Sequence, residues 1–197
     1  MTGRLIAFEG LDQSGKETQA HLLRARLEAG GREVRIYPFP DYATAIGAEL
    51  GRALRGEQEY GADVMQLLYV ANRYEWKPHI QRSLAAGRIV ICDRYLASSV
   101  AYGEAHGLDP AWLVDVQRFL PAPDLTILLD IGPETAVGRK ASNRDRFERD
   151  LALLGRVRES YRRQAAQPGW IMVDGEQPKP DVAEEVRSIV WARLAPL

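Results

Sequence analysis

The sequence has almost no cysteine and no long apolar run. Its single cysteine, Cys92, excludes a disulfide within the chain and suits a reducing compartment. Because Cys92 ends the apolar run IVIC at 89–92, we expect it to be a small buried hydrophobic residue. No stretch approaches the ~18 apolar residues of a membrane span, and the first residues lack a signal-peptide pattern. We therefore expect a cytoplasmic protein with no membrane partner.

The sequence also has little net charge. It contains 26 Lys and Arg against 27 Asp and Glu, so nothing in the overall charge indicates a nucleic-acid partner. Any basic site must then be a local concentration of cations. The length of 197 residues, with 46% apolar and 27% charged residues, fits a single domain over 1–197 with a well-buried core.

Short apolar runs alternate with longer helical patterns, which is typical of βαβ units around a parallel sheet. The predicted strands are 4–9, 34–39, 89–92, 125–130 and 170–173. They are mostly apolar on both faces, as expected when helices cover both sides of a sheet. One predicted helix follows Lys16, and a long one over about 62–86 contains Pro78, which predicts a kink or a break. The expected fold class is α/β, a three-layer sandwich with a five-stranded parallel sheet.

The stretch GLDQSGK at 10–16 fits the G-x-x-x-x-G-K pattern of a phosphate-binding loop. A predicted strand precedes it and a predicted helix follows, so backbone N–H groups and a helix N-terminus would face a phosphate. Gly10 and Gly15 permit close approach, and Lys16 supplies a point charge. The candidate phosphate-binding residues are Gly10, Gln13, Ser14, Gly15, Lys16, Glu17 and Thr18.

Glu17 occupies the position at which a Ser or Thr hydroxyl usually binds Mg²⁺, and a threonine follows only at Thr18. Three interpretations stay open. Glu17 points to solvent while an acidic group of another strand holds Mg²⁺ through water; or Glu17 ligates the metal, since Mg²⁺ prefers oxygen ligands; or the site has lost catalysis. We favour the first, because Thr18 and the other candidate residues are in place.

A second candidate group, DRYLASSVAY at 93–102, begins at the end of the third predicted strand. Asp93 stands at the carboxyl end of a strand, where parallel-sheet proteins place ligand groups, and is suited to hold Mg²⁺ or its waters. Arg94 is suited to a bidentate contact with a second phosphate. An Asp93–Arg94 ion pair at a helix start is the purely structural alternative.

Taken together, these motifs resemble those of the thymidylate kinase family, which are P-loop nucleoside-monophosphate kinases. FEGLDQSGK at 8–16 resembles the family's phosphate loop, and DRYLASSVAY resembles its D-R-[YH]-x-x-S-S-x-A-Y signature. LLYVANR at 67–73 resembles L-L-F-[AS]-A-[DN]-R, and PDLTILLDIGPETA at 123–136 resembles the fourth strand with its following helix. The resemblance implies a P-loop NTPase fold and transfer of the γ-phosphate of ATP to dTMP. It also implies Mg²⁺ as the cofactor and a homodimer.

The resemblance further implies roles for single residues. Lys16 and the loop amides hold ATP phosphates, while Arg94 contacts the acceptor phosphate and Asp12 lies near the acceptor. Tyr69 stacks on thymine and Arg73 hydrogen-bonds it; they lie four residues apart, on one helix face. The purely structural alternative is an aromatic–guanidinium stack on a core-facing helix. The remaining acceptor-binding candidates are Phe39, Ser98, Ser99 and Tyr102. The adenine would lie near 173–175.

A basic segment, RKASNRDRFER at 139–149, lies between two helical patterns and is expected to form a lid over the phosphates. Some family members carry an arginine inside the phosphate loop, where this chain has the neutral Gln13. The resemblance therefore implies that lid arginines act instead, and we expect Arg144 and Arg146 to reach the γ-phosphate. With Lys16, Asp93 and Arg94 they complete the expected catalytic set. A solvated loop is the alternative.

Besides Glu17, three residues depart from the family pattern. Pro38 replaces an arginine that binds the acceptor phosphate in many members, Asp41 replaces the arginine of F-P-R-Y, and Gly103 replaces a glutamine. Three other functions stay open: a kinase for another nucleoside monophosphate, a deoxynucleoside kinase with a hydroxyl acceptor, and a non-catalytic nucleotide-binding regulator. A GTPase is disfavoured, because no N-K-x-D follows the fourth predicted strand.

Overall fold

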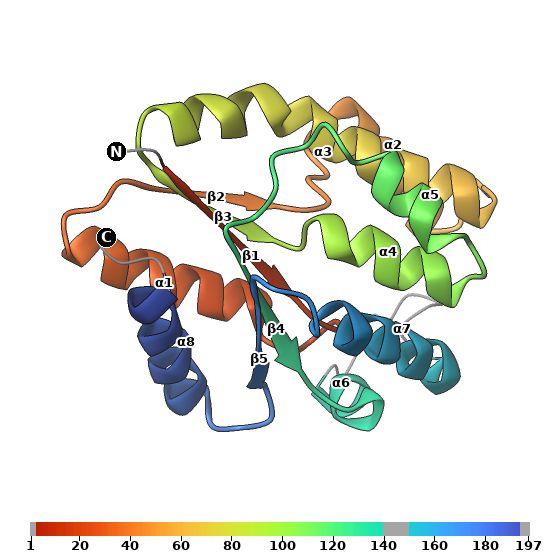
Figure 1. The fold of residues 1–197 in the computed structure, drawn as a ribbon. Helices are drawn as coiled ribbons and strands as arrows, with labels where there is room; N and C mark the ends of the chain where they lie inside the picture. Colours follow the sequence, from red (N-terminus) through yellow and green to blue (C-terminus); the bar gives the residue numbers. More distant parts are fainter. Residues whose placement is uncertain (1–2, 140–149, 194–197) are drawn as a thin grey trace.

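A five-stranded parallel sheet forms the centre of the protein, seen in a computed structural model that describes residues 3–139 and 150–193 (Figure 1). The strand order is β2-β3-β1-β4-β5, so the strand before the phosphate loop occupies the middle position. The strand bounds are β1 (Arg4–Glu9), β2 (Val34–Pro38), β3 (Ile89–Asp93), β4 (Leu125–Asp130) and β5 (Trp170–Asp174). The five predicted strands and the α/β class are thereby confirmed.

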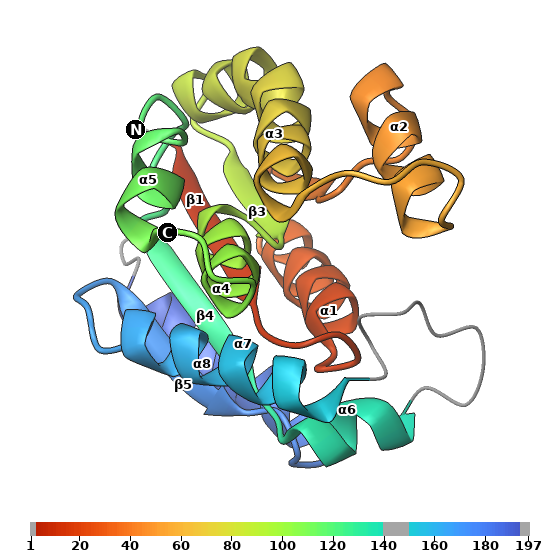
Figure 2. The ribbon, with the colours of Figure 1, turned by 90° about the vertical axis from the view of Figure 1, so that its right-hand side faces the viewer.

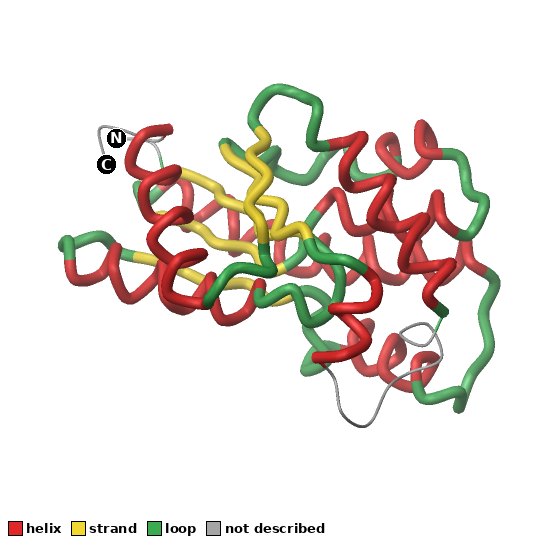
Figure 3. Tube along the Cα trace, turned by 90° about the horizontal axis from the view of Figure 1, so that it is seen from below, coloured by secondary structure: helices red, strands yellow, loops and turns green. Residues whose placement is uncertain are grey.

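Helices cover both faces of this sheet, as Figure 3 shows in a view from below, with helices in red and strands in yellow. The helix bounds are α1 (Lys16–Ala29), α2 (Ala45–Leu54), α3 (Ala62–Ala85), α4 (Leu96–Ala105), α5 (Pro110–Asp115), α6 (Pro133–Arg139), α7 (Leu151–Gln164) and α8 (Lys179–Arg193). Helices α1 and α8 pack on one face, whereas α3, α4 and α7 pack on the other. The expected three-layer arrangement is therefore present.

The alternation of side chains along β1 explains why both layers of helices are needed. Ile6 and Phe8 pack with residues of α1 and α8, while Leu5 and Ala7 pack with Ile80 of α3. Successive side chains of a strand point to opposite faces, so an apolar strand buries both faces only between two helical layers. Cys92 belongs to the same core and is fully buried, as predicted.

Helix α3 runs through Pro78 without interruption, so of the predicted kink or break, the break is wrong. A proline removes one backbone N–H from the helix ladder and commonly breaks the helix. Pro78 lies on the exposed side of α3, however, while Ile80 is fully buried and Trp76 packs against the same core cluster. Apolar packing on both sides of the proline keeps the helix continuous.

None of the described helices combines the length and apolar content that crossing a bilayer would require.

Helix α2 packs on α3 rather than on the sheet, as Figure 2 shows. Thr44 caps its N-terminus by accepting a hydrogen bond from Gly47 N at 3.0 Å. A Cβ atom on Gly47 would lie 1.7 Å from the carbonyl oxygen of Asp41, so only glycine permits this close approach. The chain after β2 is thereby held beside α3, where it forms one wall of the site described next.

Candidate active site

The phosphate loop, residues 10–16, joins β1 to α1 through an unusual backbone. Gly10, Gln13 and Gly15 all have positive φ angles, of 139°, 63° and 97°. A Cβ atom on Gly10 would lie 2.5 Å from the carbonyl oxygen of Leu129 in β4, which explains the glycine there. Gly15 is the N-cap of α1, and no described side chain caps this end of the helix. The free N–H groups and the helix dipole therefore form a site for an anion.

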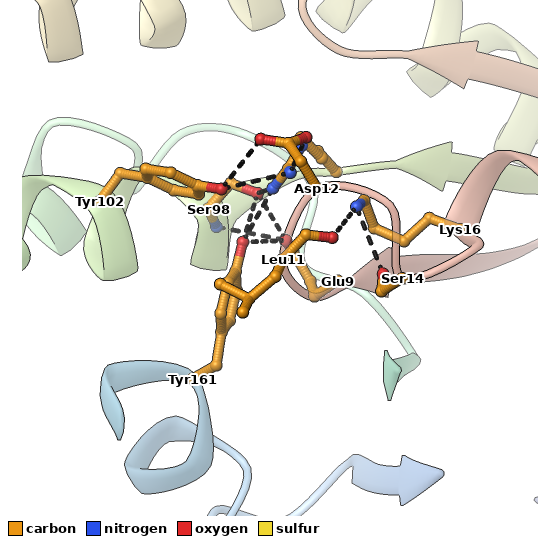
Figure 4. A network of polar contacts seen from close by, with 9 residues as sticks. Glu9, Leu11, Asp12, Ser14, Lys16, Ser98, Tyr102 and Tyr161 are labelled. Atoms are coloured by element: carbon orange, nitrogen blue, oxygen red, sulfur yellow. Dashed lines mark hydrogen bonds and ion pairs between the residues drawn. The ribbon is translucent and has the colours of Figure 1, made fainter. Parts of the chain in front are cut away.

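Lys16 is buried at the base of this loop. Its Nζ atom donates to the carbonyl oxygen of Leu11 at 2.7 Å and lies 3.4 Å from Ser14 Oγ (Figure 4). Burial lowers the pKa of Lys16 to about 8, and the positive charge of Arg94 acts in the same direction. An incoming polyanion would oppose both effects and would favour the charged ammonium.

Arg94 follows β3 with a φ angle of 62° and lies at the centre of a polar network. Its guanidinium donates to Asp12 Oδ1 at 2.6 Å and to Tyr161 Oη at 3.1 Å. Burial alone would raise the pKa of Asp12, but the charges of Arg94 and Lys16 lower it to about 2. Arg94 thus pairs with Asp12, and the alternative of a pair with Asp93 does not hold.

Glu9 supports this network and was not identified from the sequence. It is fully buried at the end of β1 and accepts from Tyr95 N at 2.8 Å, from Ser98 N at 3.3 Å and from Ser98 Oγ at 2.6 Å. Tyr161 Oη of α7 donates to the same carboxylate at 3.2 Å (Figure 4). Glu9, at the end of β1, therefore caps the N-terminus of α4. The same contacts hold the short connection between β3 and α4, which contains Arg94.

Two cavities meet at the phosphate loop. The larger, of about 1120 Å³, is lined by every predicted phosphate-binding residue except Gly10, together with Asp93, Arg94 and Arg139. The smaller, of about 330 Å³, lies beside α3 and α4. All the predicted acceptor-binding residues line it: Asp12, Phe39, Tyr69, Arg73, Arg94, Ser98, Ser99 and Tyr102. Asp12 and Arg94 line both cavities, so they stand where two ligands would meet.

Arg73 is held in the smaller cavity by partners from two other segments. Its Nη1 atom donates to Ser99 Oγ of α4 at 2.6 Å and to Gln117 Oε1 at 3.1 Å. Gln117 in turn donates to the carbonyl oxygen of Leu113 at 2.8 Å, which fixes its amide. Tyr69 lines the same cavity from the preceding turn of α3. The arrangement presents an aromatic ring and a fixed cation to a single ligand.

Two carboxylates, Asp93 and Glu17, stand at the mouth of the phosphate loop. Burial raises the pKa of Asp93; Lys16 and Arg94 oppose this, and the negative charge of Glu17 adds to it. Glu17 is exposed and lines the larger cavity. The described part of the chain holds no cluster of three or more metal-ligating His, Cys, Asp or Glu residues. One or two carboxylates together with substrate phosphates nevertheless suit Mg²⁺, which retains much of its water.

Arg139 is the one residue of the expected lid that falls within the described residues; 140–149, with Arg144 and Arg146, lie outside them. Arg139 donates to the carbonyl oxygen of Gln13 at 3.2 Å and to that of Gly175 at 2.9 Å. It therefore connects the start of the predicted lid segment to the phosphate loop and to the chain after β5. Gly175 lines the larger cavity as well.

Comparisons with known proteins point to one family. A sequence model of the thymidylate kinase family matches residues 8–186. A thymidylate kinase of Schizosaccharomyces pombe is 34% identical over 95% of this chain and 91% of its own. A probable thymidylate kinase of Pyrococcus horikoshii is 38% identical over 82% of each chain. A solved thymidylate kinase of Candida albicans, described as having broad substrate specificity, superposes with a TM-score of 0.86 at 29% identity, covering 97% of this chain and 92% of its own.

The lowered pKa of Lys16 predicts a proton uptake when a nucleotide triphosphate binds. At pH 8.5 a lysine with a pKa of about 8 is only about a quarter protonated, and a bound polyanion restores its charge. Calorimetry of ATP binding at pH 8.5, in buffers of different ionisation enthalpy, should show uptake of up to about three quarters of a proton. Affinity should fall as the pH rises above 8.

The matched variant is Lys16→Arg, because an arginine stays charged throughout this range. It should bind ATP without taking up a proton at pH 8.5. Equal uptake by the wild type and by this variant would show that Lys16 is not the group that titrates.

The contacts of Glu9 predict that Glu9→Ala destabilises the protein by about 2–4 kcal/mol, since it leaves buried donors of α4 without an acceptor. Urea unfolding measures this loss. The control is Glu159→Ala, which removes an exposed carboxylate of α7 and should change the unfolding free energy little. If the two variants were equally stable, Glu9 would not hold the network.

Proposed function

The chain belongs to the thymidylate kinase family, and from this premise we propose that it transfers the γ-phosphate of ATP to dTMP, giving dTDP and ADP in nucleotide biosynthesis. Its fold is that of the P-loop NTPases. The observation that carries the proposal is the position of Arg94, a largely buried cation that lines both cavities. An arginine in this place can contact a phosphate of either substrate.

The larger cavity is proposed as the ATP site. Its anion-binding features are the positive φ angles of the loop, the uncapped start of α1 and the buried ammonium of Lys16. Backbone N–H groups and Lys16 would hold the phosphates, and the adenine would lie toward the chain after β5. Gly175 supports that direction, because it lines the larger cavity and lies close to the phosphate loop: a Cβ atom there would be 3.4 Å from the carbonyl oxygen of Ser14.

The smaller cavity is proposed as the dTMP site, with Tyr69 stacking on the base and Arg73 donating to it. The acceptor phosphate would then face Arg94 at the junction of the cavities. A phosphate oxygen is already anionic and needs no general base, so alignment and charge neutralisation supply the rate. Phe39 is buried beside this junction and would limit the access of water.

A hydroxyl acceptor, as in a deoxynucleoside kinase, fits this cavity less well. Such a reaction needs a base, and the carboxylate among the described residues that line the smaller cavity is Asp12. Asp12 is paired with Arg94, which holds its pKa near 2 and makes it a weak base. Asp41 lines only the larger cavity, and its Oδ1 atom accepts from Ala43 N at 2.9 Å.

Mg²⁺ is proposed as the cofactor, held by Asp93 directly or through water, with Glu17 nearby. The support is chemical. Two carboxylates stand beside the phosphate loop, and burial raises the pKa of Asp93 more than Lys16 and Arg94 lower it, so a bound cation would stabilise the ionised carboxylate. The bound ion would neutralise charge on the ATP phosphates.

We also propose a homodimer and a cytoplasmic location. The exposed side chains of Val64 and Leu67 on α3 support the dimer.

Residues 139–149 are proposed as a lid, with Arg144 and Arg146 reaching the transferred phosphate. The contacts of Arg139 with Gln13 and Gly175 support this, because they start the segment at the rim of the larger cavity. The neutral Gln13 supplies no charge from the loop itself. Closure would also exclude water and so favour transfer over hydrolysis.

A coupled assay of ADP release with Mg²⁺ and a panel of acceptors tests the proposed function. We expect turnover with dTMP and none with thymidine, and dUMP and dGMP measure the breadth of the acceptor site. Faster turnover with thymidine would identify a nucleoside kinase. ATP binding without ADP release from any acceptor would identify a non-catalytic regulator, in agreement with the altered Glu17, Pro38 and Asp41.

The double variant Arg144→Ala, Arg146→Ala should lower kcat by about 10³-fold or more, because arginines that stabilise the transferred phosphoryl group contribute about 10³–10⁵ in rate. The KM for dTMP should change much less. The matched control removes two exposed arginines outside the site, Arg118 and Arg193, and should keep the wild-type rate. A loss within about threefold for the lid variant would contradict this role.

A further inference from the structure

Gln66 is a buried side chain of α3 whose carbonyl oxygen has no hydrogen-bond partner within the described chain. The residue is 5% exposed and lines the smaller cavity, one turn of α3 before Tyr69 and two turns before Arg73. A buried carbonyl oxygen without a donor is unfavourable in the free protein. Oε1 itself has almost no exposed surface in the free protein, but the side chain borders a cavity large enough for a nucleotide base. A half-turn of the amide about its last bond would bring the oxygen to this cavity, where a ligand can supply the missing donor.

Gly103 of α4 leaves the room that Gln66 uses. A Cβ atom at Gly103 would lie 3.3 Å from Cγ of Gln66 and 2.5 Å from Cδ1 of Leu113. Any larger residue at this position would therefore push against the stem of Gln66. The amide is confined between α3 and α4, with its position set by packing rather than by hydrogen bonds to its carbonyl oxygen.

Arg73 restricts what this amide can recognise. Its Nε atom is also buried without a partner in the described chain, and a guanidinium can only donate. A ligand that satisfies both residues must present a hydrogen-bond acceptor to Arg73 and a donor to the carbonyl of Gln66. Thymine and uracil carry this pair side by side, as O4 and N3–H. Cytosine carries the reverse pair, an amino group beside an unprotonated N3.

We infer that Gln66 accepts a hydrogen bond from N3–H of the acceptor base and thereby selects thymine and uracil against cytosine. This inference rests on the proposed function, because it assumes that the base of the monophosphate occupies the smaller cavity. Gln66 acts on the binding of the base, remote from the transferred phosphate, so its effect falls on KM rather than on kcat.

The test compares wild type with Gln66→Met, which keeps an unbranched side chain and removes the amide. For dTMP, KM should rise about tenfold with kcat nearly unchanged, and the ratio of kcat/KM for dTMP over dCMP should fall by at least fivefold, of the order expected for one hydrogen bond. The KM for ATP should stay the same. The thermal midpoint should stay equal or rise, since the variant removes an unsatisfied buried oxygen.

Gln19→Met is the matched control. Gln19 is another buried glutamine whose Oε1 atom has no partner in the described chain, but it belongs to α1 and lines the larger cavity, the proposed ATP site, and not the smaller one. It should leave the ratio of dTMP to dCMP within twofold of wild type. An unchanged ratio in Gln66→Met, or an equal change in both variants, would overturn the inference.

A ligand-side comparison serves if Gln66→Met does not fold. For the wild-type protein, N3-methyl-dTMP lacks the N3–H donor but keeps O4 as a carbonyl acceptor, and it should have a KM about tenfold or more above that of dTMP. Equal KM values would also overturn the inference. The two proposals fail separately: a wild-type protein inactive toward dTMP refutes the proposed function, whereas an active protein indifferent to N3–H refutes only the role of Gln66.

Discussion

The ion pair between Arg94 and Asp12 is the interaction on which the rest of the site depends. A buried guanidinium is costly unless its charge is balanced and its N–H groups are bonded. Asp12 supplies the charge at 2.6 Å, and hydroxyl groups of Ser98 and Tyr161 accept at 3.2 and 3.1 Å. Those hydroxyls are themselves fixed by Glu9. The phosphate loop, β1, α4 and α7 thus meet around one cation, which stands between the two proposed substrates.

The electrostatics of the free site are arranged for an anionic ligand. Lys16 has a lowered pKa because it is buried close to Arg94, and Asp93 has a raised pKa because burial outweighs the nearby cations. Both groups would gain from a phosphate–metal complex: the anion relieves the repulsion between the cations, and the metal relieves the burial of the carboxylate. The loop backbone, with Gln13 in a left-handed conformation, is already shaped for this ligand.

The sequence predicted those features that depend on local pattern. Strand periodicity, the spacing of Gly10, Gly15 and Lys16, and the DRY motif all operate over a few residues, and the structure places them as expected. Glu9 and Tyr161 were not predicted because their partners lie 63–152 residues away. A charged residue that ends an apolar strand was nevertheless a usable signal for Glu9. Tyr161 follows the apolar periodicity of α7 and resembles any core residue. The break predicted at Pro78 is absent because the apolar packing of α3 around it outweighs the helix-breaking propensity of proline.

The departures from the family pattern have a common physical consequence at the acceptor. Pro38 is exposed at the end of the edge strand β2, and Asp41 is used structurally: its N–H donates to Asn72 Oδ1 at 2.8 Å and its carboxylate accepts from Ala43 N. Neither position offers a cation. Among the described cations, Arg94 is the one that lines both cavities; Arg73 lines only the smaller cavity and Lys16 only the larger. Because Asp12 already neutralises part of the charge of Arg94, the proposed acceptor phosphate would be bound less by net charge than by the fixed geometry of this pair. Recognition of the proposed acceptor would then depend more on its base and on the residues of α3 that line the smaller cavity.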